Sequence, residues 1–268
     1  MKVLEYLKVF VLCALVSSVM NANVSNTSVE YKKIVDNKQG KSLAFDSFIE
    51  NLLDYDIIII GEYHNLNSHK LAEFDIIHAL KAHKKLSIVY EMLPSSKQKQ
   101  INNAIAKKDS IKKNELPHAL FWIDDWEYAG SGYERLLESL FYAGDSLIGG
   151  NLSYEEKSLI AENMPKLQGK NSTNPTVQNT LKQIIGGFHA KKWDSIFVNI
   201  QQHIDRNLAQ KMLENPNPVA IVGAYHASKA IGVPLHIKDL DSSKKVAVIS
   251  LDGGENFGLR DADFTIYF

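Results

Sequence analysis

The stretch DIIIIGEYHN, Asp56 to Asn65, indicates how this sequence folds. Four consecutive isoleucines would bury both faces of a strand, and such strands are typical of a parallel sheet that is covered by helices. The apolar run stops at a glycine, and side chains with polar groups follow it at once: Glu62, Tyr63, His64 and Asn65. The stretch therefore predicts an interior strand whose carboxyl end opens onto a polar site.

The stretch VAIVGAYHAS, Val219 to Ser228, repeats this pattern. An apolar run meets a glycine, and Tyr225 and His226 follow. Ligands of open α/β sheets bind beyond the carboxyl ends of the strands, and all strands of a parallel sheet end on the same side. We therefore expect both turns to lie at one edge, with Glu91 and Asn151, which follow two further predicted strands. Each of these side chains could also have a purely structural role, such as accepting backbone N–H groups at a helix start.

Short apolar runs alternate with helical patterns along most of the chain. This rhythm predicts an α/β fold with a mainly parallel β-sheet flanked by helices, joined by right-handed crossovers. The predicted strands are residues 31–35, 56–60, 86–90, 146–150, 218–223, 235–240, 245–251 and 263–268. The predicted helices are residues 42–53 (capped by Ser42), 67–84, 95–107, 133–143 and, as a short one, 226–232.

Residues 153–215 interrupt this rhythm. They contain only helical patterns, at residues 154–163, 176–190 and 193–214. With residues 95–126 they predict a smaller all-helical subdomain inserted on the sheet.

The composition is that of one large globular domain. The chain has 268 residues, 45% hydrophobic residues and a formal net charge of −1. It lacks the basic stripe by which proteins hold nucleic acid, so nucleic acid is not an expected partner.

Residues 1–22 predict a secretory signal peptide. Lys2 and Lys8 precede an apolar run, Val9 to Leu15, that is too short to span a membrane. Cleavage would leave a domain of residues 23–268 without cysteine, because Cys13 lies inside the run. We expect an exported protein, periplasmic or associated with the outer membrane. Whether Cys13 carries a lipid anchor stays open, because Leu12 before it departs from a lipoprotein signal.

Five segments in order resemble the ChaN-like haem-uptake proteins. GEYHNLNSH resembles the GE-x-H opening of that family, and VYEML resembles its strand-end Glu-Met. WEYAGSGYERLLE is similar to a W…Y…L segment, and NIQQHIDRNLAQKM to a Gln-x-x-x-Asp helix on Gln201 and Asp205. GAYHASKAIGVP resembles the closing motif, on His226, Lys229 and the Gly-Val-Pro that begins at Gly232. The matches extend from about residue 31 to the C-terminus.

The resemblance implies a parallel sheet with flanking helices and a small helical domain. It also implies haem binding in iron acquisition, with a tyrosine as the iron ligand and haem held between two subunits. A homodimer formed around ferric haem and an outer-membrane haem receptor are therefore expected partners. The family's members are commonly lipoproteins.

Tyr133 is the first candidate for the ligand of the haem iron. It stands at the family's tyrosine position, and Gly130-Ser131-Gly132 before it would let the chain approach a flat ligand closely. It could equally do no more than begin an amphipathic helix. Tyr225 and Tyr63 are the alternatives, because each lies at the predicted sheet edge.

The haem propionates need cations or hydrogen-bond donors. His226 and Lys229 stand three residues apart on a predicted helix, so they would share a face and could clamp a propionate. A helix N-terminus there would favour an anion. His64 is the remaining haem-binding candidate, as part of the GE-x-H signature.

A metal-dependent hydrolase is the alternative function. The wider GE-x-H superfamily includes metal-dependent proteases and esterases. Two histidines and two acids could hold Zn²⁺ or Mn²⁺ with a position left for water: Glu62, His64, Glu91 and His226.

Overall fold

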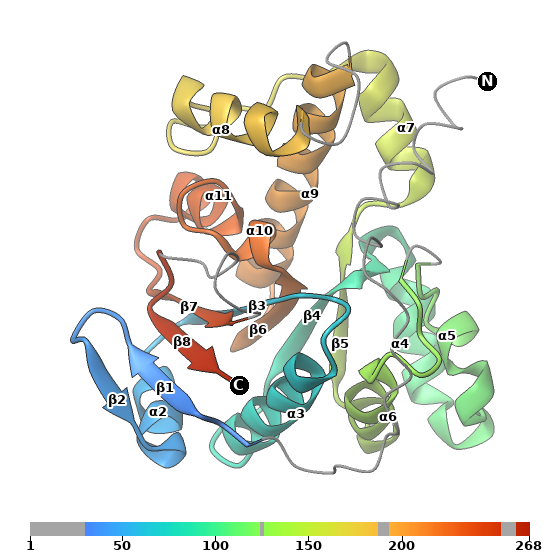
Figure 1. Ribbon diagram of the computed structural model, residues 1–268. Coiled ribbons are helices and arrows are strands. Elements are labelled where there is room, and N and C mark those ends of the chain that lie inside the picture. Colours follow the sequence, from blue (N-terminus) through green and yellow to red (C-terminus); the bar gives the residue numbers. More distant parts are fainter. Residues whose placement is uncertain (1–29, 124–125, 187–192, 253–260) are drawn as a thin grey trace.

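One mainly parallel sheet organises the molecule (Figure 1). The computed structural model describes residues 30–123, 126–186, 193–252 and 261–268. Within them, eight strands pair in the order β2-β1-β8-β7-β3-β6-β4-β5. The strands from β8 to β5 are parallel, and β1 pairs antiparallel with β2 and β8. The strands are β1 (Lys33–Asp36), β2 (Lys41–Leu43), β3 (Ile57–Glu62), β4 (Ser87–Pro94), β5 (Ser146–Asn151), β6 (Pro218–Gly223), β7 (Val246–Leu251) and β8 (Phe264–Tyr267).

Helices cover both faces of this sheet, which confirms the predicted α/β class (Figure 1). One face carries α2 (Phe45–Leu52), α3 (Asn67–Lys81), α4 (Gln98–Ala106), α5 (Leu116–Ala119) and α6 (Tyr133–Ala143). The other face carries α7 (Tyr154–Asn163), α8 (Pro175–Gly186), α9 (Asp194–Leu213), α10 (Ala224–Ala227) and α11 (Val233–Leu240).

The four isoleucines of β3 show why both faces need cover. Ile58 and Ile60 belong to the core under α2 to α6, and Ile57 and Ile59 belong to the core under α7 to α11. Each of the four is at most 2% exposed. Side chains alternate across a strand, so an uninterrupted apolar run fills two cores at once.

The predicted helical segment 153–215 holds α7, α8 and α9. Helix α9 packs against β4, β5 and β6, and its Ile200, Ile204 and Leu208 are buried in the core of that face. The longest helix of the segment is therefore part of the layer that covers the sheet. It also carries side chains to the carboxyl edge of the strands.

Three local predictions were wrong. Residues 235–240 are not a strand but most of α11, because Val233, His236 and Ile237 are buried with helical spacing. Ser42 does not cap α2; it pairs with Val35 in a hairpin, and the helix begins after Ala44. The helix predicted at 226–232 is α10, which ends at Ala227.

The predicted signal peptide, residues 1–22, lies outside the described residues. None of the helices in the described part of the chain has the length and hydropathy needed to cross a membrane.

Candidate functional site

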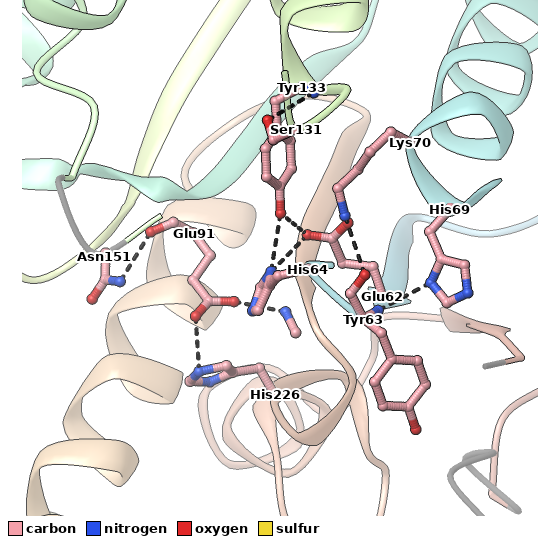
Figure 2. A network of polar contacts seen from close by, with 11 residues as sticks. Glu62, Tyr63, His64, His69, Lys70, Glu91, Ser131, Tyr133, Asn151 and His226 are labelled. Carbon is pink, nitrogen blue, oxygen red and sulfur yellow. Dashed lines mark hydrogen bonds and ion pairs between the residues drawn. The ribbon is translucent and has the colours of Figure 1, made fainter. Parts of the chain in front are cut away.

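Polar side chains from distant segments meet at the carboxyl edge of the sheet (Figure 2). Glu62 ends β3 and pairs in register with Gly223, which ends β6. Glu91 lies near the end of the neighbouring β4, and Asn151 ends β5 and donates to the Glu91 carbonyl oxygen at 2.9 Å. The structure thus brings together the strand ends that the parallel topology predicted.

Glu62 is the centre of a first cluster, which also contains His64, Lys70, Glu73 and Tyr133 and is called the Glu62 cluster below. Lys70 Nζ and the Tyr133 hydroxyl both donate to the Glu62 carboxylate. His64 Nδ1 lies 2.8 Å from Glu62 Oε1 and 3.0 Å from the Tyr133 hydroxyl. Lys70 Nζ also lies 4.4 Å from the centre of the Tyr133 ring. All but His64 are buried, so these contacts replace the water that the charges lose.

The charges of the Glu62 cluster balance internally. Burial raises the pKa of Glu62, but the charge of Lys70 and the hydrogen bond from His64 outweigh it and hold that pKa well below its usual range. Burial, followed by the charge of Glu62, raises the pKa of Glu73 well above its usual range, so Glu73 keeps its proton. The same two causes raise the pKa of Tyr133. One carboxylate and one ammonium therefore share this site with the protonated carboxyl of Glu73 and the phenol of Tyr133.

His226 is the centre of a second cluster, which also contains Glu91 and Asp205 and is called the His226 cluster below. Its Nδ1 lies 2.5 Å from Asp205 Oδ1, and its Nε2 lies 3.2 Å from Glu91 Oε1. Gln201 Nε2 lies 2.9 Å from Nδ1. Burial lowers the pKa of His226, but the charges of Glu91 and Asp205 overcome it and raise the pKa to about 10. His226 is therefore a buried imidazolium between two carboxyl groups.

His64 connects the two clusters. A Cβ atom added at Gly223 would lie 2.9 Å from His64 Nε2 and 3.6 Å from Glu91 Oε2. Only glycine leaves room for the imidazole at this point of β6. Trp126 packs edge-on against His64, with ring centres 5.7 Å apart. The side chain of His64 is 21% exposed, so it forms part of the boundary between the buried charges and the surface.

The three candidate tyrosines lie in different environments. Tyr133 is buried at 3% exposure, and its hydroxyl is occupied by Glu62. Tyr225 is 49% exposed on α10, although its neighbours Ala224 and His226 are buried. Tyr63 is half-buried, and Figure 2 shows its ring pointing away from Glu62. Burial, followed by smaller electrostatic contributions from Tyr225 and Asp252, raises the pKa of Tyr63 to about 12.

The shared helix face on which the predicted clamp of His226 and Lys229 depended is not present in the structure. Helix α10 ends at Ala227, so the two residues do not share a helix face. His226 is enclosed by carboxyl groups, and Lys229 Nζ pairs with Asp263 Oδ1 at 2.5 Å. A four-residue helix also provides little of the dipole that the prediction relied on.

Lys70 and Glu73 are site residues that the sequence interpretation missed. Both lie on α3 and are at most 2% exposed. Their signal was available: they stand three residues apart on a helix face that continues with buried Ile76 and Ile77. Charged residues on the apolar face of a helix that follows a strand-end acid indicate a buried ion pair.

The hydrolase alternative needs a group of metal ligands around one point. Among the described residues, no group of three or more His, Cys, Asp or Glu side chains could hold a metal ion. The four residues of that alternative are divided between the two clusters. Glu62 is paired with Lys70, and Glu91 with His226, so each acid already has a cation.

Comparisons with known proteins were made for the sequence and for the fold. The family model for haem-binding uptake, Tiki superfamily, ChaN, matches residues 48–237. ChaN of Campylobacter jejuni, solved with cofacial heme binding, is 33% identical with a TM-score of 0.83, covering 89% of this chain and 98% of that chain.

Two further solved structures are much less similar. The type III effector HopBA1 is 15% identical with a TM-score of 0.44, covering 90% of this chain and 98% of that chain. An erythromycin esterase EreC mutant is 11% identical with a TM-score of 0.48, and the match covers 89% of this chain and 83% of that chain. A search of curated proteins found no match. The family match and the similarity to ChaN agree with the five sequence segments, and the chain belongs to the ChaN family of haem-binding uptake proteins.

Proposed function

We propose that this protein binds ferric haem at the carboxyl edge of the sheet, with the Tyr225 phenolate as the axial ligand of the iron. The observation that carries the proposal is the position of Tyr225. It is 49% exposed between two buried residues, Ala224 and His226, so a large part of this residue is accessible to a ligand while the chain on both sides of it is packed into the protein. Tyr133, the first candidate from the sequence, is only 3% exposed and its hydroxyl donates to Glu62, which favours Tyr225 over it.

The donor chemistry at this edge suits the ligand. Haem supplies an iron with an axial position and a flat apolar ring, and tyrosine is among the axial ligands that proteins use. The chain offers the phenol oxygen of Tyr225 and the half-buried ring of Tyr63, which follow the ends of the adjacent strands β6 and β3, where Gly223 pairs with Glu62. The metal itself favours loss of the phenol proton, as bound cations do for their ligands.

A second copy of the chain is part of the proposal. Haem on an exposed tyrosine is covered on one face only, and its other apolar face would stay in water at a cost proportional to its area. ChaN of Campylobacter jejuni binds heme cofacially, and face-to-face rings cover each other. We therefore propose a homodimer that encloses haem. An uptake role outside the cytoplasm, with an outer-membrane receptor as donor, is the setting that the family implies.

A hemin titration tests the iron ligand. We expect a tyrosinate-type ferric spectrum, its loss in Tyr225→Phe, and its retention in Tyr133→Phe and Tyr63→Phe. The proposal is wrong if hemin binds no better than to an unrelated protein, or if Tyr225→Phe leaves the spectrum unchanged.

Mass measurement during the same titration tests the dimer. The mass should double as hemin is added, and a monomer at saturation would refute the enclosed dimer. Fractionation of cells that express the full chain tests export. We expect the protein in the fraction outside the cytoplasm.

A further inference from the structure

We propose that the His226 cluster positions Tyr225, so that Asp205 and Glu91 set the geometry of iron ligation without touching haem. This inference rests on the proposed function, because it assigns a role around the proposed iron ligand. It gives His226 a role that differs from propionate binding. It also accounts for Gln201 and Asp205, which the sequence singled out and haem binding alone leaves unexplained.

Helix α10 needs external support to hold Tyr225 in one place. It has four residues, Ala224 to Ala227, and a helix this short is not stable by itself in water. Tyr225 is 49% exposed, so its own side chain has few contacts that could hold the backbone. The position of its hydroxyl therefore depends on the residues beside it.

Glu91 holds α10 at two points. Its Oε2 accepts the N–H of Gly223, the residue before the helix, at 2.7 Å. Its Oε1 lies 3.2 Å from Nε2 of His226, near the end of the helix. One side chain of β4, at 4% exposure, thus fixes both sides of Tyr225 against the sheet.

Helix α9 supports the opposite side of the His226 ring. Gln201 and Asp205 are four residues apart, so they lie on one face of α9. Both are at most 9% exposed. Asp205 Oδ1 accepts from His226 Nδ1 at 2.5 Å, and the side-chain amide of Gln201 packs against the same nitrogen, with its Nε2 at 2.9 Å. The ring is thereby held from both nitrogens, by groups on two elements that belong to the core.

The chain after α10 is packed as closely. A Cβ atom at Gly232 would lie 2.2 Å from the carbonyl oxygen of His226 and 2.7 Å from that of Tyr225. Asp261 accepts hydrogen bonds from Ser228 Oγ and from the backbone N–H of Ala230. The residues after α10 therefore also restrict the backbone of Tyr225 and His226.

Close contacts at both ring nitrogens give this arrangement its rigidity. His226 Nδ1 lies 2.5 Å from Asp205 Oδ1, and its Nε2 lies 3.2 Å from Glu91 Oε1. A displacement of α10 would lengthen or break at least one of these two contacts. We infer that the cluster restricts Tyr225 to one orientation and so lowers the ordering cost of haem binding.

Asp205→Asn tests the inference, with Asp239→Asn as the matched control. Asp239 of α11 is also a carboxylate with little exposed side chain, 5%. It accepts from Asn171 and Ser172 and pairs with Arg206 at 3.9 Å, and none of these partners belongs to the His226 cluster. Both variants should lose stability. Only Asp205→Asn should weaken hemin binding, by about tenfold or more, which corresponds to about 1.4 kcal/mol. Only Asp205→Asn should shift the tyrosinate charge-transfer band at saturating hemin.

The outcomes separate this inference from the proposed function. If Tyr225→Phe abolishes the band but Asp205→Asn matches Asp239→Asn in affinity and spectrum, the inference is refuted and the iron ligand stands. If Tyr225→Phe keeps the band, the proposed function fails first. Should Asp205→Asn not fold, Gln201→Leu replaces it, because it keeps every charge. It should shift the band in the same direction with a smaller loss of affinity, and an unchanged titration would refute the inference.

Discussion

Lys70→Met is the substitution that most directly tests the Glu62 cluster. The side chains of Lys70 and Glu62 are 1% and 0% exposed, and Lys70 Nζ is the cation nearest to the Glu62 carboxylate. Methionine keeps much of the apolar stem of lysine but removes the charge. Glu62 would then be a buried carboxylate held only by neutral donors and His64.

The expected loss follows from the burial. Breaking a buried ion pair by removing one partner costs about 3–5 kcal/mol. For a domain of this size each 1 kcal/mol lowers the melting temperature by about 2–4 °C, so we expect a fall of about 6–20 °C. Lys81→Met is the matched control, because its pair with Asp145 is partly exposed, at 24% and 19%. Such surface pairs contribute about 0–1 kcal/mol.

The loss of stability in Lys70→Met should depend on pH, because the substitution changes the direction in which the pKa of Glu62 is shifted. In the native protein the pKa of Glu62 is depressed, so its contribution to stability is present above the unfolded pKa and is lost as pH falls through the folded pKa. Without Lys70, burial dominates and raises the pKa above the unfolded value. The variant then recovers stability as Glu62 takes up a proton. The difference from the native protein should be larger at about pH 8 than at about pH 5.

Thermal and urea unfolding, followed by circular dichroism at both pH values, measure these differences. The variant Lys70→Met/Glu62→Gln should be more stable than Lys70→Met alone, because no buried charge is left without a partner. The reasoning is refuted if Lys70→Met loses less than about 1 kcal/mol, the range of a surface pair. Equal losses at both pH values would also refute it.

Two further predictions concern the junction between the clusters. Gly223→Ala should displace His64, because the new methyl group would lie 2.9 Å from its Nε2. The overpacking should destabilise the fold by about 1–3 kcal/mol. An unchanged His64 resonance in NMR spectra would contradict this prediction. The ion pair of Glu91, with its pKa lowered to about 2, and His226, with its pKa raised to about 10, should stabilise the fold most between the unfolded values, about pH 4.5 and 6.5. Its contribution should decline as pH falls from about 4.5 toward 2, and as pH rises from about 6.5 toward 10. Urea midpoints across pH, compared with those of Glu91→Gln, measure it, and a difference that does not vary with pH would contradict the assignment.

Local patterns were sufficient for much of the fold. The apolar run of β3 predicted a strand buried on two faces, and its isoleucines do enter two separate cores. The helices at residues 133–143 and 154–163 begin and end where the amphipathic spacing placed them. Local patterns gave the wrong secondary structure at residues 235–240, because six residues with this pattern of apolar side chains fit both a strand and a helix. They also failed where a distant partner competed, as when β1 paired with the residues around Ser42.

The sequence by itself determined the α/β class, the family and the meeting of strand ends at one edge. Each follows from patterns within a few residues and from the geometry of parallel strands. Only the tertiary structure decided that Tyr133 is buried while Tyr225 is exposed, since both tyrosines follow a glycine-containing turn in the sequence. It also decided the partner of each charge. Glu91 and His226 are 135 positions apart, and burial and Coulomb energy depend on distance in space, not on distance along the chain.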